Sequence, residues 1–455
     1  MIKVEMLPDM TPTQSASHAA LQCYQSTVPK VGKEIDVENR LFRVSHHTTM
    51  QHSDAYRTNS IDGIAVGDVT FGLHLVSPFY NTDQRSGRYA AKMFTEPDFD
   101  KMMQYVRVYW PQVSSRDLVE IERYLEFGVK IYQENKSEAN KIAADFLRQE
   151  RPFIANKMVA QIAPKVAQEQ LRMFISTIFP TALDFTLNLT ALVAMYEEAW
   201  TPAMKDVTAK IAGAFSQKYP DIAYVFDESR RREGDWFVQP PSHSDIEIAT
   251  EPYIFSCNVQ NEHVFVQPNA DVMHPVDKSH FAPEMMNNSI GDIEVCVGMS
   301  VATMGQDQRH RTIRRGAPQF TGAFYLPPIV QKLGLGGRAR DLMSQWISIE
   351  KTVPGTLAMI LAPYGAVVEY IKKGSFNAIL HEQYKRLCWC AQEEIYYLGV
   401  LEREAVAKKC GINSDLLAMF QPPCFELGKC AEGDRYCGRD IRLRNDGDYF
   451  PRRMV

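Results

Sequence analysis

The hydrophobic and polar positions along the chain first predict a long amphipathic helix. Apolar residues recur at helical spacing within residues 116–149, with charged residues between them: Leu118, Ile121, Leu125 and Val129. Helical spacing continues through residues 165–179 and 187–200 to about Ser216. Before about residue 110 the pattern predicts irregular structure or strands.

A break follows at residues 229–245, which contain a charge run, a glycine and a Pro-Pro pair. The arginines at 230–232 are expected to form a solvated linker. After the break, residues 245–268 alternate as strands do, and helices are expected from Lys332 to Lys409. Both halves therefore run from strands, through a cationic loop, to helices.

This order predicts an internal duplication, although two unrelated domains of mixed structure would give a similar pattern. The predicted ranges are 1–228 for the first repeat, 229–245 for the linker, 246–409 for the second repeat and 410–455 for a Cys-rich tail.

Composition narrows the function classes. The chain has 455 residues, of which 45% are hydrophobic and 23% charged, as is typical of a globular protein. A net charge of −5 argues against general nucleic-acid binding and favours a local cationic pocket. We expect a cytoplasmic protein with no membrane partner, because no leader pattern or long apolar run is present. The odd number of cysteines, nine, argues against a disulfide framework.

Residues 306–328 concentrate cationic side chains and then end in an aromatic, proline-stopped run, Phe324–Pro328. The cationic positions are Arg309, His310, Arg311, Arg314 and Arg315. Packed cations repel one another, so this segment needs carboxylates or a phosphorylated ligand nearby. A solvated turn, neutralised by acids such as Asp307, is the alternative.

A second loop, residues 79–94, contains Ser86-Gly87-Arg88-Tyr89. A glycine lets the backbone approach a ligand closely, and a neighbouring hydroxyl and guanidinium suit phosphate oxygens. A helix-capping turn is the alternative for this segment.

Four short segments resemble those of flavin-dependent thymidylate synthases. Two are the segments above: the Arg-His-Arg triplet with its aromatic close, and Ser86–Tyr89. Residues 46–52 resemble a His-x-Thr-x-x-Glu-His segment, with Gln51 in place of Glu. In residues 384–395, Arg386 precedes Ala391-Gln392 as an arginine does in the family's late helix. The resemblance covers most of the chain as two copies and implies an α+β fold, with helices beside a mixed sheet in each repeat.

The resemblance also implies an activity. In the family, reduced FAD relays a one-carbon unit from methylenetetrahydrofolate to C5 of dUMP, with NADPH as the reductant. Arg386 would hold and polarise the uracil ring, although a solvated or ion-paired arginine is the alternative. The nucleotide phosphate would lie on Ser86, Gly87 and Arg88. The flavin would lie on Arg309, His310, Arg311, Thr48, Gln51 and His52, of which the last three could also form an ordinary polar turn.

Each half departs from the family pattern. Residues 318–323 lack the expected Ser and Arg, and residues 76–78 lack the expected cations. Each half keeps what the other lacks, so a site shared between repeats is expected, in a homodimer that imitates the family's tetramer. Two alternatives stay open: hydroxymethylation or another C5 modification of a pyrimidine nucleotide, and a catalytically silent homologue that serves as a scaffold or binding protein.

The tail places four cysteines among turn formers: Cys410, Cys424, Cys430 and Cys437. Four thiolates complete a tetrahedral zinc site, so a structural zinc ion is one prediction. Buried thiols acting as small hydrophobic groups are the alternative. Cys388 and Cys390, which flank Trp389, are expected in the core.

Overall fold

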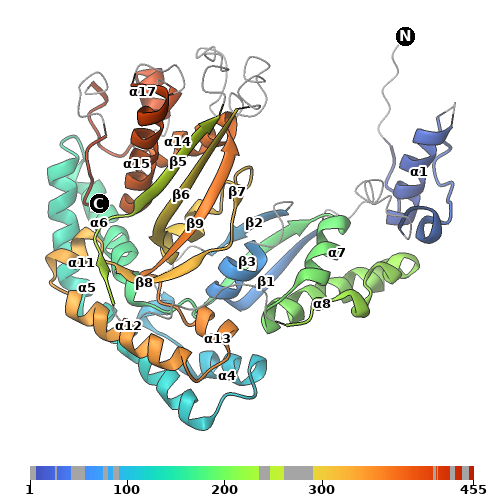
Figure 1. Cartoon of the computed structure of the whole chain (residues 1–455), viewed down its shortest axis with the longest axis horizontal. Coiled ribbons are helices and arrows are strands. Elements are labelled where there is room, and N and C mark those ends of the chain that lie inside the picture. The colour runs from blue at the N-terminus through green and yellow to red at the C-terminus, as the bar shows by residue number, and fades with distance from the viewer. Residues whose placement is uncertain are drawn as a thin grey trace. The chain divides into compact units, whose positions relative to one another are not determined.

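The computed structural model contains two units, each built on its own sheet (Figure 1). Unit 1 comprises Met1–Arg85 and Pro180–Trp236, and unit 2 comprises Ser86–Phe179 and Phe237–Val455. The structure describes residues 7–25, 28–42, 57–74, 80–85, 92–234, 246–260, 291–412, 417, 419–430, 436–442 and 450–455.

Unit 1 contains a three-stranded antiparallel sheet in the order β1-β3-β2. Its strands are β1 (Arg57–Ala65), β2 (Tyr80–Gln84) and β3 (Pro180–Leu187), and its α-helices are α1 (Pro12–Tyr24), α7 (Leu189–Glu198) and α8 (Pro202–Lys218). Thr201 begins α8, because its hydroxyl accepts a hydrogen bond from the amide of Met204 and donates one to Asp68 at 2.6 Å.

Unit 2 contains a six-stranded mixed sheet in the order β4-β8-β9-β6-β5, with β7 also paired to β9. Its strands are β4 (Ile248–Ala249), β5 (Tyr253–Gln260), β6 (Asp292–Ser300), β7 (Arg314–Arg315), β8 (Gln319–Tyr325) and β9 (Ala366–Ser375). Only the β4–β8 pair is parallel among the described strands. The strand β9 therefore lies inside the sheet, where its side chains are mostly buried.

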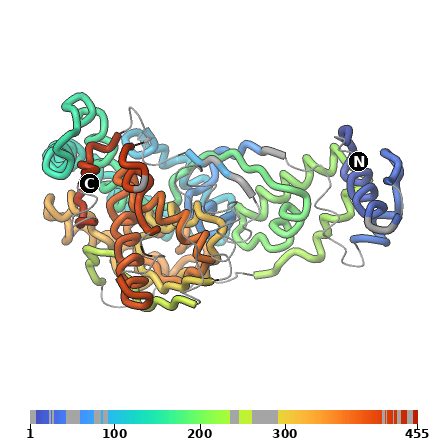
Figure 2. Tube along the Cα trace, turned by 90° about the horizontal axis from the view of Figure 1, so that it is seen from above, coloured from blue at the N-terminus to red at the C-terminus, as the bar shows by residue number. Residues whose placement is uncertain are grey.

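Some helices of unit 2 precede its strands in the sequence, and the others lie between or after them. They are α3 (Lys92–Thr95), α4 (Phe99–Tyr109), α5 (Ser115–Glu150), α6 (Asn156–Leu171), α10 (Val301–Asp307), α11 (Pro328–Lys332), α12 (Gly336–Glu350), α13 (Gly355–Ile360), α14 (Phe376–Arg386), α15 (Glu393–Cys410) and α17 (Pro423–Leu427). The last residues of the chain lie beside α6, as Figures 1 and 2 both show.

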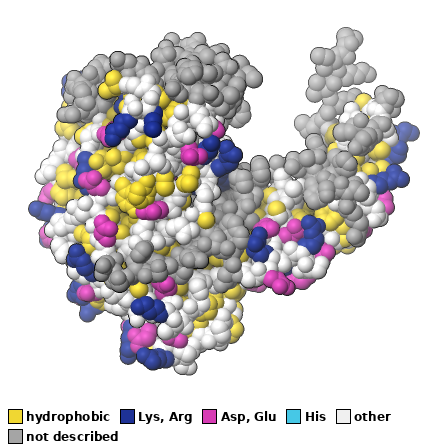
Figure 3. Space-filling view, in the orientation of Figure 1, with side chains coloured by type: hydrophobic (Ala, Val, Ile, Leu, Met, Phe, Trp, Pro, Cys, Tyr) yellow, Lys and Arg dark blue, Asp and Glu magenta, His cyan; other side chains and the backbone are white. Residues whose placement is uncertain are grey.

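Close packing across the sheet of unit 2 depends on one glycine. A Cβ atom at Gly298 would lie 2.2 Å from the ring of Tyr253, so no other residue fits there without displacing the ring. Across Gly298, the Tyr253 hydroxyl donates a hydrogen bond to Glu369 at 2.7 Å. Figure 3 shows hydrophobic side chains exposed on this unit, and Phe255 and Ile371 are among its exposed apolar residues.

The structure confirms some of these expectations and overturns others. The predicted helix over 116–149 is confirmed by α5. The expectation of helices throughout Lys332–Lys409 is wrong, because β9 pairs with β6 and β8 in the middle of that range. The arginines at 230–232 do not form a solvated linker. Arg231 packs over the ring of Tyr196 at 4.3 Å, and its neighbours form ion pairs with α7.

The observed units also comprise other residue ranges than the predicted repeats. Helices α5 and α6, which fall in residues 1–228, belong to unit 2 and pack there against α11 and α12. The two sheets differ in strand number and order. The fold is therefore mixed α+β, and no tandem repeat is evident in the described residues.

Candidate functional site

The cationic segment at 306–315 is built around one buried carboxylate. Asp307 ends α10, and the guanidinium of Arg315 forms an ion pair with it. Arg315 also donates to the carbonyl oxygens of His310 and Ile313, at 2.9 Å each. Tyr370 on β9 donates to the same carboxylate at 2.8 Å. Arg315 therefore closes the loop 307–315 onto its own backbone.

Lys372 on β9 brings two more carboxylates to this cluster. Its ammonium lies 3.4 Å from Asp307 and 2.6 Å from Glu382 on α14, and it also pairs with Glu402 on α15. All four side chains are at most 3% exposed. Lys372 reaches this position because residue 372 of β9 pairs with Val295 of β6 on one side and Arg315 of β7 on the other.

Burial and pairing shift the pKa values of the cluster in opposite directions. Burial opposes ionisation of Asp307, but Arg315 and Lys372 hold the pKa of its carboxyl well below the usual range. Burial raises the pKa of Glu382, and the charges of Asp307 and Glu402 add to this rise. The cations of the cluster are thus matched by carboxylates, and one carboxyl readily keeps a proton.

The predicted Arg-His-Arg triplet lies on the loop that this cluster fixes. Arg309 is exposed, Arg311 is partly exposed and His310 is 8% exposed. Burial, the charge of Arg386 and the neighbouring His381 hold the pKa of His310 well below its usual range, so this imidazole is neutral at pH 7. Its Nδ1 atom is buried and has no hydrogen-bond partner among the described residues.

Arg386, predicted to contact the substrate, ends α14 next to this loop. Its Nη2 donates to the carbonyl oxygen of Gln306 at 2.5 Å, and its Nε is buried without a hydrogen-bond partner among the described residues. The side chain of Gln306 donates to Gln392, which precedes α15. Two predicted segments that are distant in sequence, 306–311 and 384–395, therefore meet at Gln306.

A second buried carboxylate lies close to α10 without an ion-pairing lysine. Glu394 accepts hydrogen bonds from the amide of Ser300 at 2.7 Å and from the hydroxyls of Ser300 and Thr303 at 2.5 Å each. Burial raises the pKa of Glu394 to about 7, although these hydrogen bonds oppose the rise. Glu394 therefore anchors the start of α10 and titrates near neutral pH.

Several predicted site residues lie outside the described residues, namely Thr48, Gln51, His52, Ser86, Gly87 and Arg88. The structure leaves their placement open, and the shared site between repeats stays a prediction.

Three of the four predicted zinc ligands lie near one another: burial raises the pKa of the Cys424 thiol, and Cys437 and Cys430 add to this rise. The fourth, Cys410, lies near Cys257 on β5, because it adds to the rise that burial causes in the pKa of Cys257, to about 11. The Cys390 thiol lies within hydrogen-bonding reach of Cys388 and Cys437, and Cys390 is exposed rather than in the core. Within the described ranges, no three His, Cys, Asp or Glu side chains form an arrangement that would hold a metal ion.

Sequence reasoning missed the residues that hold the loop: Lys372, Glu382 and Glu402. One signal was available for Lys372, which follows residues 366–371, a run that is apolar or aromatic except at Glu369 and is typical of a strand. A lysine at the end of such a run needs a carboxylate partner. Nothing in the sequence pairs it with two glutamates of later helices.

No known protein family, curated protein or solved structure matches the chain. Among the helices in the described part of the chain, none has both the length and the apolar character needed to cross a bilayer.

Proposed function

We propose that the protein is a flavin-dependent enzyme that methylates dUMP reductively at C5, using methylenetetrahydrofolate and NADPH. The observation that supports this proposal is the hydrogen bond from Arg386 to the carbonyl oxygen of Gln306. The resemblance assigns Arg386 to the pyrimidine and residues 309–311 to the flavin. A flavin and a pyrimidine that react must lie in contact, and these two segments do lie together.

The residues present fit an anionic cofactor. The negative charge of Asp307 faces Arg315 and Lys372, and two more cations of the same loop reach the surface, since Arg309 is exposed and Arg311 is partly exposed. The buried Nδ1 of His310 and Nε of Arg386 are unsatisfied among the described residues, and a buried polar atom without a partner typically costs about 1–3 kcal/mol. A ligand with both hydrogen-bond donors and acceptors would recover this free energy.

Each residue then has a definite task. Arg309 and Arg311 would bind the cofactor's phosphates, and neutral His310 would accept or donate a hydrogen bond without adding charge. Arg386 would stabilise negative charge that develops on the uracil ring. Reduced FAD, when bound, supplies the reducing equivalents for the new methyl group.

We also propose that the chain arose by duplication and pairs as a homodimer, in which Ser86, Gly87 and Arg88 complete the nucleotide site. Sedimentation of the full chain at micromolar concentration should then give the mass of a dimer. A strictly monomeric mass would contradict this assembly.

The visible absorption spectrum of the purified protein tests the proposed function. Flavin bands should be present, and Arg311→Ala should weaken flavin affinity on the order of tenfold, which is about 1.4 kcal/mol. Arg314→Ala is the matched control, because Arg314 is an exposed cation of the same loop. Arg386→Ala should retain flavin and lose dUMP binding.

Product analysis then separates methylation from hydroxymethylation of the nucleotide. A protein that binds neither flavin nor dUMP would contradict the proposal and favour a silent scaffold. Equal flavin loss in Arg311→Ala and Arg314→Ala would show that the loop does not bind the cofactor.

A further inference from the structure

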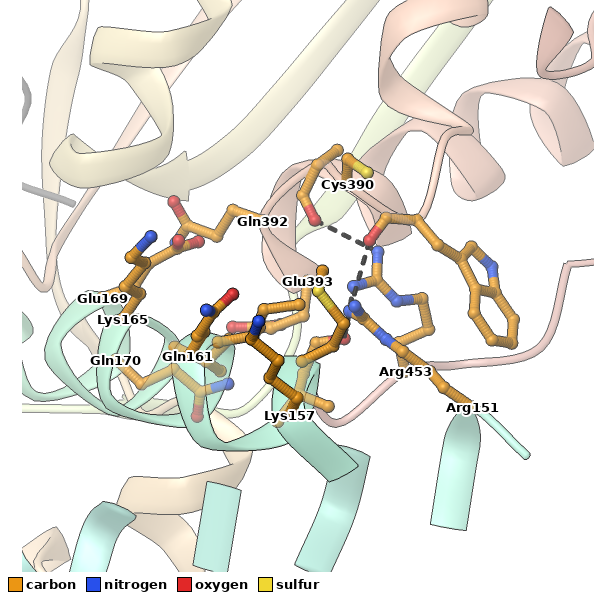
Figure 4. Close-up of a pocket in the computed structure, with 16 residues that line it drawn as sticks. Arg151, Lys157, Gln161, Lys165, Glu169, Gln170, Cys390, Gln392, Glu393 and Arg453 are labelled. Carbon is orange, nitrogen blue, oxygen red and sulfur yellow. Dashed lines mark hydrogen bonds between the residues drawn. The ribbon is translucent and has the colours of Figure 1, made fainter. Parts of the chain in front are cut away.

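A cavity of about 740 Å³ lies in unit 2 between α6 and the residues around Trp389 (Figure 4). Lys157, Gln161 and Lys165 line it from α6, and their spacing of four residues places them on one face of the helix. The opposite wall consists of residues 389–393 with Arg453 and Val455. Arg309, His310, Arg311 and Arg386 are not among the lining residues, so the cavity is separate from the loop that we assign to flavin.

Two buried arginines of this cavity bind backbone oxygens. Arg151 donates to the carbonyl oxygen of Trp389 and to an oxygen of Val455, the last residue of the sequence, at 3.2 Å each. Arg453 donates to the carbonyl oxygen of Ala391 at 3.1 Å and also to Val455. Glu150 accepts a hydrogen bond from the amide of Met454, and burial raises the pKa of its carboxyl. The cavity itself is lined by four cationic side chains, Arg151, Lys157, Lys165 and Arg453, and by the two carboxyl groups of Glu169 and Glu393. Positive charge is therefore in excess along the lining.

Four hydrogen-bond donors of the lining residues are buried and lack a partner among the described residues. They are the Nε atoms of Arg151 and Arg453, the Nε2 atom of Gln392 and the Nε1 atom of Trp389. Burial and the charge of Glu394 raise the pKa of Glu393 well above the usual range, which favours the protonated, neutral form of this carboxyl. The cavity thus offers donors and positive charge, and an apolar floor formed by Met158, Ile162 and Val166.

We propose that this cavity binds a phosphorylated organic molecule of about nucleotide size. Its phosphoryl oxygens accept from Arg151, Arg453 and the two lysines of α6, and its organic part packs on the apolar floor. The volume falls within the roughly 300–1,000 Å³ of small-molecule sites. The site goes beyond the proposed function and does not depend on it. It touches the candidate site through Gln392, which lines the cavity and whose Oε1 accepts a hydrogen bond from Gln306.

Calorimetric titration of the full chain tests this proposal with four probes: AMP, ribose 5-phosphate, inorganic phosphate and adenosine. AMP or ribose 5-phosphate should bind, and adenosine, which lacks the anion, should not. Lys157→Met combined with Lys165→Met should weaken binding roughly tenfold. Both lysines are exposed, so this variant should fold, and Lys141→Met on α5 is the matched control. Arg453→Met should abolish binding.

Arg311→Ala separates this site from the proposed flavin site, because it should leave the affinity for the probes unchanged. No binding of either organic phosphate would overturn the proposal. So would binding that Arg311→Ala weakens while the double lysine variant leaves it intact. Binding of inorganic phosphate alone would overturn the assignment to an organic molecule.

Discussion

Two groups of buried cations in unit 2 differ in what they face. Lys372 and Arg315 face carboxylates, and the cluster that they form fixes the loop 307–315. Arg151 and Arg453 face backbone carbonyls and keep unpaired Nε atoms. A buried cation that carboxylates of its own chain neutralise stabilises the fold, whereas one with fewer such partners favours binding of an anion. The comparison therefore sets a structural charge cluster against the cavity that we propose to bind a phosphorylated molecule.

Removal of Lys372 should have the largest effect on stability. Lys372→Met leaves Asp307, Glu382 and Glu402 buried around an apolar side chain, which should lower the free energy of unfolding by about 3–5 kcal/mol. Urea denaturation measures this change. The adjacent Lys373, 28% exposed, pairs with Asp292 and Glu294 at 3.6 Å each, so Lys373→Met should cost about 1 kcal/mol or less. Equal losses in the two variants would contradict the role of the cluster.

Glu394 should give a pH dependence that its amide variant lacks. Because burial raises its pKa to about 7 in the folded protein, the folded state binds more protons than the unfolded state between about pH 4.3 and 7. This residue's contribution to stability should fall as the pH rises through that window, by about 4 kcal/mol at most.

The difference in free energy of unfolding between wild type and Glu394→Gln isolates the contribution of Glu394, since Glu382 and Glu402 titrate in both proteins. Urea denaturation at several pH values should give a flatter profile for the variant. Glu294→Gln, at a partly exposed position of β6, is the control and should keep the wild-type slope. Parallel profiles for Glu394→Gln and wild type would contradict the assignment.

Removal of Arg453 should have the smallest effect on stability. Arg453→Met loses hydrogen bonds to Ala391 and Val455, but it also removes a buried charge whose carboxyl neighbours Glu150 and Glu393 both have raised pKa values. The net loss should be about 1 kcal/mol in the absence of ligand. Thermal unfolding with added AMP sharpens the comparison, because AMP should stabilise wild type and leave this variant unchanged. A loss as large as that of Lys372→Met would show that both cation groups are structural.

Local pattern predicted the long helix α5, because thirty-six residues of helical periodicity leave no other way to bury the apolar face. It failed at β9, whose alternation is short and whose assignment depends on pairing with β6 and β8. The segments 306–311 and 384–395 were singled out from their residues, and the structure brings them together at Gln306. The cluster that positions them could not, because Lys372, Glu382 and Glu402 become neighbours only through the packing of β9, α14 and α15.

The cluster around Lys372 also bears on how the chain folds. Its charges come from α10, β7, β9, α14 and α15, so it can lose its water only after β9 has paired with β6 and the later helices have docked. Contacts between such distant segments form late, because loop closure has to precede them. Their free energy is then mostly absent from the folding transition state. We therefore expect the residues that hold the cationic loop in place to slow the unfolding of unit 2 and to have little effect on its folding rate.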